Sequence, residues 1–382
     1  MSQRLKTDWT LFFTVLAMVS FGVLMLYSAS SINAKMDPRY HSLWYFVIRQ
    51  LEWAALAVAV MMALKKTDYR RWNNSAVAFS AVGVILLLLV AVYFVDARHR
   101  WLSIHGVMGV QPSELAKPAL VIFLAYFVTW RGPAINNRRY TLLPAALAVG
   151  LVIFWVVVAD LGTAVVLGAT AAVVFFVAGL EWRYCAIVSA VAFVGVLVFI
   201  VVDPYRLARV VRYFDPQFKI VSRFDPQGKV KARMEKSLAT RDTNYQLEQA
   251  KIAVGSGGPL GLGLMNGKQK LQYLPFAHTD FIYAVVGEEM GLIGAGGLLI
   301  GFGVIFWRGL RAAWLIQEDF GRYLALGVTV VVVVQGLINM TVVLGLMPTK
   351  GIPLPMISYG GSSLLSTLAL LGILMNVSEH AG

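Results

Sequence analysis

The chain has 382 residues, of which 58% are hydrophobic and 14% charged, and its mean hydropathy is +0.70. This composition excludes a set of water-soluble domains and indicates a polytopic membrane protein. Its net charge is +13. Because so apolar a chain has no large soluble face for a nucleic acid, anionic lipid or a phosphorylated lipid-borne substrate is the expected partner. A single cysteine, Cys185, excludes an intramolecular disulfide and a CxxC metal or redox site.

Windows of about 20 mostly apolar residues predict ten membrane-spanning helices. Only Asp160 separates the fifth window from the sixth, so the turn between them must be tight. The first window is longer than the core of a cleaved signal peptide, so we expect it to be retained. The fold class is therefore an all-α polytopic membrane protein, with residues 1–382 as one integral membrane domain. The windows are 9–29, 43–64, 72–95, 112–130, 140–159, 161–180, 184–202, 280–307, 323–346 and 358–377.

The distribution of Lys and Arg over the short connections predicts the orientation, because positive loops stay in the cytoplasm. One side collects thirteen basic residues and the other five, which places both termini in the cytoplasm. The larger set is Arg4, Lys6, Lys65, Lys66, Arg70, Arg71, Arg131, Arg138, Arg139, Arg183, Arg308, Arg311 and Arg322; the smaller is Lys35, Arg39, Arg98, Arg100 and Lys350.

Residues 203–279 form the longest connection, between the seventh and eighth windows. They carry 13 Lys and Arg against 6 Asp and Glu, a net charge of +7. Long loops are translocated whatever their charge, so this excess does not reverse the orientation. We expect a large basic extracytoplasmic loop at the outer membrane face.

Charged side chains within the apolar windows are costly and are therefore usually paired or functional. Arg49 and Glu52 lie three residues apart and are expected to form a structural ion pair. Lys117 follows Glu114 by three residues on one helix face, and it is also the natural partner of the carboxylate of Asp160. This group could be a staple between helices or the floor of a polar cavity.

His278, Thr279 and Asp280 stand at the outer mouth of the eighth window. Asp280 could simply cap the helix start. Alternatively, Glu288 lies eight residues further on, about 12 Å deeper and turned by only about 80°, so both carboxylates could face one cavity. Such an acidic track exceeds what a cap requires.

Two further features suggest an anion-binding face. Arg206, Arg209 and Arg212 recur every third residue, so a helix would align them for phosphate contacts or for anionic headgroups. The glycine-rich stretch that begins at Gly255 and runs to Gly263 does not match a nucleotide-binding loop. It indicates a close backbone turn instead.

Six ordered motifs resemble the SEDS family of bacterial proteins (shape, elongation, division and sporulation), which includes FtsW, RodA and SpoVE. The resemblance covers nearly the whole chain, and its most specific motif is PTKGIPLPMISYGGSS at 348–363. The others are RWL at 100–102, QPSELAK at 111–117, DLGTA at 160–164, IAVGSGG at 252–258, and HTDF with GEEMG within 278–291.

The resemblance implies a peptidoglycan glycosyltransferase that polymerises lipid II at the outer face of the bacterial inner membrane. Asp280 then carries the catalytic carboxylate, either as a general base or as a ligand of a divalent cation, Mg or Mn. Residues in the matching motifs, together with the arginine face, are expected to bind substrate or shape the cavity. They are Arg100, Glu114, Lys117, Asp160, Arg206, Arg212, His278, Glu288, Lys350 and Ser362.

Thr349 to Gly351 and the stretch before His278 look more like FtsW than RodA, which favours septal synthesis over elongation. A class B penicillin-binding protein is the implied partner, alongside other division or elongation membrane proteins, and no nucleic acid is expected. Two functions of other classes compete, a lipid II flippase and a non-catalytic divisome scaffold. A flippase should continue its polar groups to the cytoplasmic side, and a scaffold needs no acidic track.

Overall fold

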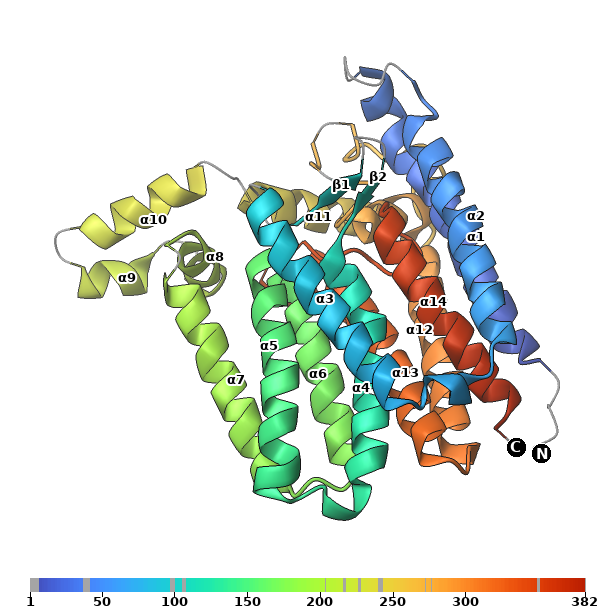
Figure 1. Ribbon diagram of the computed structural model, residues 1–382. Helices are drawn as coiled ribbons and strands as arrows, with labels where there is room; N and C mark the ends of the chain where they lie inside the picture. The colour runs from blue at the N-terminus through green and yellow to red at the C-terminus, as the bar shows by residue number, and fades with distance from the viewer. Residues whose placement is uncertain are drawn as a thin grey trace.

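The computed structural model describes residues 7–36, 42–96, 100–104, 108–202, 204–215, 218–225, 228–239, 243–271, 273–275, 277–348 and 351–381. It is a helical bundle with one small β-hairpin (Figure 1). The elements are α1 (Trp9–Met36), α2 (Tyr45–Lys66), η1 (Tyr69–Trp72), α3 (Ser75–Val95), β1 (Leu102–Ile104), β2 (Met108–Val110), α4 (Pro112–Arg131), η2 (Gly132–Ala134), η3 (Arg138–Leu142), α5 (Leu143–Ala159), α6 (Leu161–Val177), α7 (Trp182–Val202), α8 (Pro204–Phe214), α9 (Lys219–Phe224), α10 (Lys229–Ala239), α11 (Thr243–Gly257), α12 (Ile282–Leu315), α13 (Asp319–Val343) and α14 (Gly361–Glu379).

The predicted spans all coincide with apolar helices. Nine helices of the described chain are long and apolar enough to cross a membrane, and the sixth window forms α6, a shorter apolar helix of 17 residues. Asp160 makes the expected tight turn, since α5 ends at Ala159 and α6 begins at Leu161. Asp160 Oδ1 accepts from the backbone N–H of Gly162 at 2.9 Å and Oδ2 accepts from Thr163 Oγ1 at 2.7 Å. Its carboxylate thereby caps α6.

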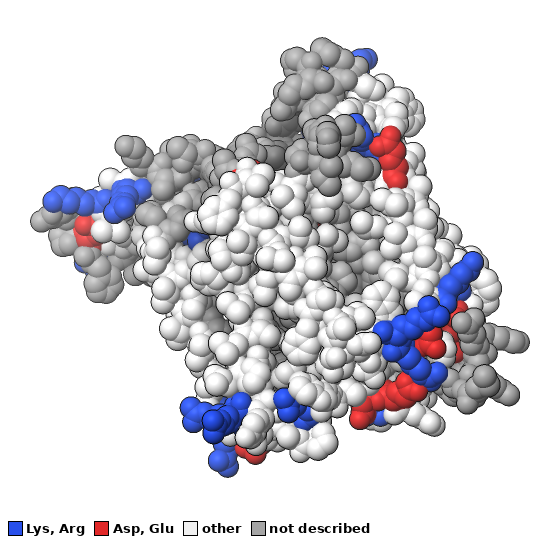
Figure 2. Space-filling view, in the orientation of Figure 1, with Lys and Arg blue, Asp and Glu red and all other residues white. Residues whose placement is uncertain are grey.

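The two termini lie at the same end of the bundle, and the β-hairpin and α8 to α11 lie at the opposite end (Figure 1). Charged side chains gather near these ends, whereas the middle of the visible face is uncharged (Figure 2). A wide uncharged band between charged ends is the surface that a lipid bilayer selects.

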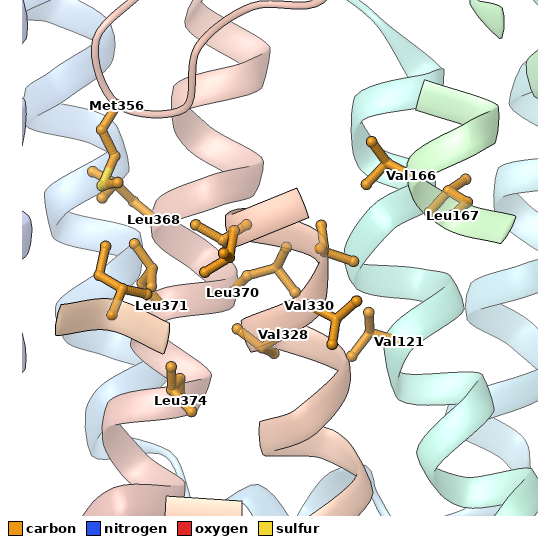
Figure 3. Packing of buried hydrophobic residues seen from close by; sticks show 14 of the residues in the cluster. Val121, Val166, Leu167, Val328, Val330, Met356, Leu368, Leu370, Leu371 and Leu374 are labelled. Atoms are coloured by element: carbon orange, nitrogen blue, oxygen red, sulfur yellow. The ribbon is translucent and has the colours of Figure 1, made fainter. Parts of the chain in front are cut away.

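Helices α4, α6, α13 and α14 form the centre of the bundle. Their facing surfaces are packed with branched aliphatic residues such as Val121, Val166, Val328 and Leu371 (Figure 3). Helix α7 differs, since its apolar residues are mostly exposed and no residue in its most apolar stretch is buried within the protein. The centre of the bundle therefore supplies the rigid support for the loops at its ends.

Helix α12 is interrupted at Gly291, whose φ is +62°. The residues after α11 fill this break. The carbonyl groups of Glu288 and Glu289 accept from the backbone N–H groups of Leu262 at 3.0 Å and Gly263 at 2.9 Å. Across the break, the N–H of Leu292 donates to Gly258 O at 2.9 Å. The glycine-rich stretch is thus the predicted close turn, and it replaces helical hydrogen bonds that α12 lacks at this point.

The described residues of the basic segment 203–279 are largely helical. The segment contains α8 to α11 before the turns that lead to α12. Gly257 allows α11 to pack tightly on α12, because a Cβ there would lie 1.9 Å from Gly287 O.

Candidate active site

Asp280 lies two residues before α12, at the end of the bundle opposite the termini. The residue is partly exposed. It does not cap the helix, because Phe281 occupies the N-cap position and no side chain there accepts a capping hydrogen bond. A Cβ added at Gly351 would lie 2.7 Å from Asp280 Oδ2, so the α13–α14 loop (351–360) runs directly past the carboxylate. The capping alternative is therefore wrong.

Two loops are fastened to each other around Asp280. Asn339 of α13 donates through Nδ2 to the carbonyl oxygen of Asp280 at 2.8 Å and to that of Ile352 at 2.7 Å. Ser358 Oγ donates to Thr279 O at 2.6 Å, and the N–H of Tyr359 donates to His278 O at 3.0 Å. These bonds fix the backbone on both sides of the carboxylate.

Charged groups surround the carboxylate of Asp280. Burial raises its pKa from 3.8 to about 6; the guanidinium groups of Arg100 and Arg209 act in the opposite direction, and the carboxylate of Asp160 adds to the rise. Arg100 Nη2 lies 3.9 Å from Asp160 Oδ2. Asp96 Oδ2 holds the turn before β1 by accepting from the backbone N–H of Arg100 at 2.9 Å. A carboxylate with a pKa near 6 can accept a proton near neutral pH.

His278 packs in an aromatic cluster beside this carboxylate. Its ring centroid lies 4.7 Å from that of Phe46 and 6.0 Å from that of Tyr359. Burial lowers its pKa to about 4, so the imidazole is neutral at pH 7. His278 therefore contributes shape rather than charge to the site.

Lys117 does not pair with Asp160, contrary to the prediction. Its ammonium group forms an ion pair with Glu114 on the same helix and donates to Gln335 Oε1 at 2.7 Å. Lys117 and Glu114 are both 1% exposed. Gln335 in turn donates to Pro353 O at 2.9 Å. This buried group therefore supports the α13–α14 loop from beneath, while Asp160 forms its ion pair with Arg100.

Glu288 does not extend an acidic track from Asp280. Its Oε1 accepts from the backbone N–H groups of Lys268 at 2.7 Å and Gln269 at 3.1 Å. Glu289 accepts from Lys270 Nζ at 2.6 Å and pairs with Ser28 of α1. Carboxylates that accept such bonds are satisfied within the protein. Both residues anchor the segment after α11 onto α12.

The remaining predicted residues lie in several places. Helix α8 forms as expected, but the Arg206 guanidinium stacks 3.7 Å from the Phe199 ring of α7. Arg212 lies on α8 and is partly exposed, and Ser362 is buried in the first turn of α14. Lys350 lies outside the described residues. Of the arginine face, Arg209 is the member that acts electrostatically on Asp280.

The ligand set for a divalent cation is incomplete. Among the described residues, no group of three or more His, Cys, Asp and Glu side chains could hold a metal ion. Asp280 and Asp160 share their surroundings with guanidinium groups, which compete with a cation for the carboxylates. These side chains alone therefore do not fit a resident cation.

Several residues of the site escaped the sequence reasoning. Gln335 and Asn339 lie four residues apart, on one face of α13, and both donate to the α13–α14 loop. Gln50 of α2 joins the same loop by donating to Ser358 O at 3.3 Å. In the sequence, these residues could have been recognised as polar amides inside apolar windows, where polar side chains are costly.

Fold and site together define an integral membrane protein with a partly exposed carboxylate, flanked by arginines, at one end of a helical bundle. The chain belongs to the FtsW/RodA/SpoVE family of cell cycle proteins, whose family model matches residues 8–382. The probable peptidoglycan glycosyltransferase FtsW of Geobacter sulfurreducens is 38% identical over 98% of this chain and 96% of its own length. Stage V sporulation protein E of Bacillus subtilis is 33% identical over 100% of this chain and 99% of its own.

Solved structures show the same architecture. One chain of a peptidoglycan synthase complex that coordinates polymerization and crosslinking is similar with a TM-score of 0.74, 30% identity and coverage of 97% of both chains. The rod shape determining protein RodA of Thermus thermophilus is similar with a TM-score of 0.64 and 28% identity, over 98% of this chain and 97% of its own.

Proposed function

We propose that this protein is a peptidoglycan glycosyltransferase that polymerises lipid II, with Asp280 as the catalytic carboxylate. The observation that carries the proposal is the placement of Asp280, partly exposed and with a pKa near 6, beside Arg100 and Arg209. Family membership and the names of the relatives support the reaction class.

The reaction joins two lipid-linked disaccharides. The 4-hydroxyl oxygen of one attacks C1 of the other, the bond from C1 to the pyrophosphate oxygen breaks, and the anomeric centre inverts. Asp280 accepts the hydroxyl proton, a contribution of typically 10² to 10⁴ in rate. The departing undecaprenyl pyrophosphate takes the electron pair of the broken bond.

Arginine side chains are suited to the pyrophosphate because a guanidinium group makes bidentate bonds to phosphate oxygens. The buried Nε–H of Arg100 has no hydrogen-bond partner in the described part of the protein. A leaving group on which negative charge develops would satisfy that donor, and the interaction would strengthen in the transition state. A divalent cation, Mg or Mn, would add Lewis-acid neutralisation of the pyrophosphate if substrate oxygens completed its ligand set.

Orientation, location and partner follow as parts of the same proposal. The excess of basic residues at the terminal end supports an orientation with both termini in the cytoplasm and Asp280 at the outer face of the bacterial inner membrane. The relatives named FtsW favour septal synthesis in cell division, with an elongation polymerase of the RodA type as the alternative. The similar chain from a synthase complex supports a class B penicillin-binding protein as partner.

The test measures glycan polymerisation from lipid II by purified protein, with and without its cognate class B penicillin-binding protein. We expect Asp280→Ala and Asp280→Asn to abolish polymer while retaining the wild-type melting temperature or exceeding it. Asp319→Asn, at the terminal end, is the matched control and should retain activity. Normal polymer from the Asp280 variants would remove Asp280 from catalysis. Lipid II transfer across vesicles without polymer would favour the flippase instead.

A further inference from the structure

A group of unpaired arginines lies on two connections at the terminal end of the bundle. Arg131 is the last residue of α4, Arg138 and Arg139 begin η3 in the α4–α5 connection, and Arg183 lies at the start of α7. We call these four residues the arginine patch. Asn136 joins the two connections, since its Nδ2 donates to Gly179 O at 3.2 Å and its Oδ1 accepts from the N–H of Glu181 at 2.8 Å. The four guanidinium groups are therefore held on neighbouring turns.

Among the described residues, no carboxylate neutralises the arginine patch. Within the described part of the chain, none of the four has a carboxylate within 4.0 Å, and Glu181 is the acidic residue on these two connections. Arg131 stacks 3.8 Å from the Trp130 ring, and its buried Nε–H has no described hydrogen-bond partner. Its guanidinium group thus retains donors for a ligand.

Elsewhere at the terminal end, four other basic residues form ion pairs. There Lys65 pairs with Glu379, Arg70 with Glu318, Arg308 with Asp8, and Arg322 with Asp319. In Figure 2, Lys and Arg atoms gather at the lower left beside a small acidic area, where Figure 1 places the α4–α5 and α6–α7 connections, and larger acidic areas adjoin the basic atoms at the lower right. The arginine patch therefore brings four basic residues without a described acidic partner onto neighbouring turns, whereas Lys66, Arg71 and Arg311, also without one, lie on other elements of this end.

The patch lies at the depth of lipid headgroups. Tyr140 and Leu143 follow Arg139 and are 59% and 57% exposed, and Trp182 beside Arg183 is 72% exposed. Exposed apolar residues on a membrane helix contact acyl chains, and exposed Trp and Tyr mark the interface. Arginines directly beyond them reach the phosphate layer of the adjacent leaflet.

We propose that the arginine patch binds anionic phospholipid headgroups, such as that of phosphatidylglycerol, in the leaflet at the terminal end. Guanidinium groups bind phosphate oxygens in pairs, and basic residues near a membrane surface attract anionic lipid. The inference does not depend on the glycosyltransferase proposal, because the patch lies at the opposite end from Asp280.

Native mass spectrometry of the detergent-solubilised protein, titrated with phosphatidylglycerol, tests the proposal. The variant carries Arg138→Gln, Arg139→Gln and Arg183→Gln, which leaves Arg131 on its Trp130 ring. A charge-matched control carries Lys66→Gln, Arg71→Gln and Arg311→Gln. These three residues are also exposed, lie at the same end and take part in no described ion pair. Melting temperatures check that both variants are folded.

We expect the patch variant to weaken binding of the first phosphatidylglycerol by about tenfold or more, and the control by less than about threefold. Phosphatidylcholine, which is zwitterionic, should bind wild type and both variants alike. Equal losses in the two variants would reduce the effect to overall charge and overturn the proposal. Unchanged binding in the patch variant would also overturn it and would direct attention to an acidic protein segment as the occupant.

Discussion

At the scale of single residues, the proposed function rests on the ionisation of Asp280 and on the groups that position it. Burial raises the pKa of its carboxyl group to about 6, with Arg100 and Arg209 limiting the rise. Asn339 connects the backbone of Asp280 to that of Ile352 with one amide nitrogen. Both effects require neighbours that are distant in the sequence.

The pKa of Asp280 predicts a pH dependence of activity and of stability. Polymerisation should fall as the pH drops through about 6, because the base becomes protonated. As the pH rises, the unfolded chain loses the Asp280 proton before the folded protein does, because the pKa is higher in the folded state. The contribution of Asp280 to stability therefore declines between about pH 4 and 6 and stays low above pH 6. Asp280→Asn should therefore be more stable than wild type at pH 7.5, by on the order of 2 kcal/mol in unfolding free energy. At pH 4 the variant and wild type should have nearly the same stability. Thermal unfolding at both pH values measures this, and a constant difference would contradict it.

Asn339→Leu should lower the turnover number about 10- to 100-fold with a smaller change in KM, because the carboxylate shifts relative to the bound substrate. Asn376→Leu is the matched control. Asn376 is an equally buried amide at the terminal end, where it donates to Lys65 O at 2.7 Å and accepts from the N–H of Tyr69 at 2.9 Å. The control should lose stability but keep its turnover number. Steady-state kinetics measure the effect on turnover, and melting curves measure the effect on stability. Equal turnover numbers in both variants would argue against a role of Asn339 in positioning the Asp280 carboxylate.

At the scale of elements, the site depends on the interrupted helix α12. Gly291 breaks the helix, and the segment after α11 fills the break with backbone hydrogen bonds. Glu288 and Glu289 then bind the same segment through their side chains. The pair that looked like an acidic track in the sequence is thus an anchor for the turns that precede Asp280.

Gly261→Ala should destabilise this junction. The φ of Gly261 is +81°, and a Cβ there would lie 2.2 Å from Glu289 O, so the segment must move out of the break. We expect a loss of about 2 kcal/mol or more. Gly303→Ala is the control within α12, because a Cβ there meets nothing within 4 Å; it should be neutral or stabilise by about 0.5 to 1 kcal/mol. Melting in detergent measures both, and similar behaviour of the two variants would exclude a tight junction.

At the scale of the whole molecule, ion pairs join the chain ends to the bundle. Asp8 pairs with Arg308, and Glu379 pairs with Lys65. The site at the opposite end combines the turns before α12 and the α13–α14 loop with charged residues from before β1, from between α5 and α6, and from α8. Both termini and the arginine patch therefore face one side, while Asp280 faces the other.

Cysteine labelling of a Cys185→Ser protein should report this arrangement. Gln317 is exposed between α12 and α13 at the terminal end, and Tyr273 is 56% exposed in the turns before Asp280. A membrane-impermeant maleimide should label Tyr273→Cys but not Gln317→Cys from outside in spheroplasts, with the reverse in inside-out vesicles. Labelling of both positions from one side would contradict the topology.

The sequence alone was enough to locate the long apolar helices, because hydrophobicity over about 20 residues is a local property. It also marked Asp280, Asp160 and the glycine turns, since each lies in a short distinctive motif. The partners of the buried charges follow from helix packing, which the sequence does not reveal. Lys117 could reach Glu114 or Asp160 on spacing alone, and helix packing selected Glu114 and Gln335. The amides of Gln335 and Asn339 gained their meaning from loops that return more than ten residues later, because long-range backbone contacts leave no local pattern in the chain.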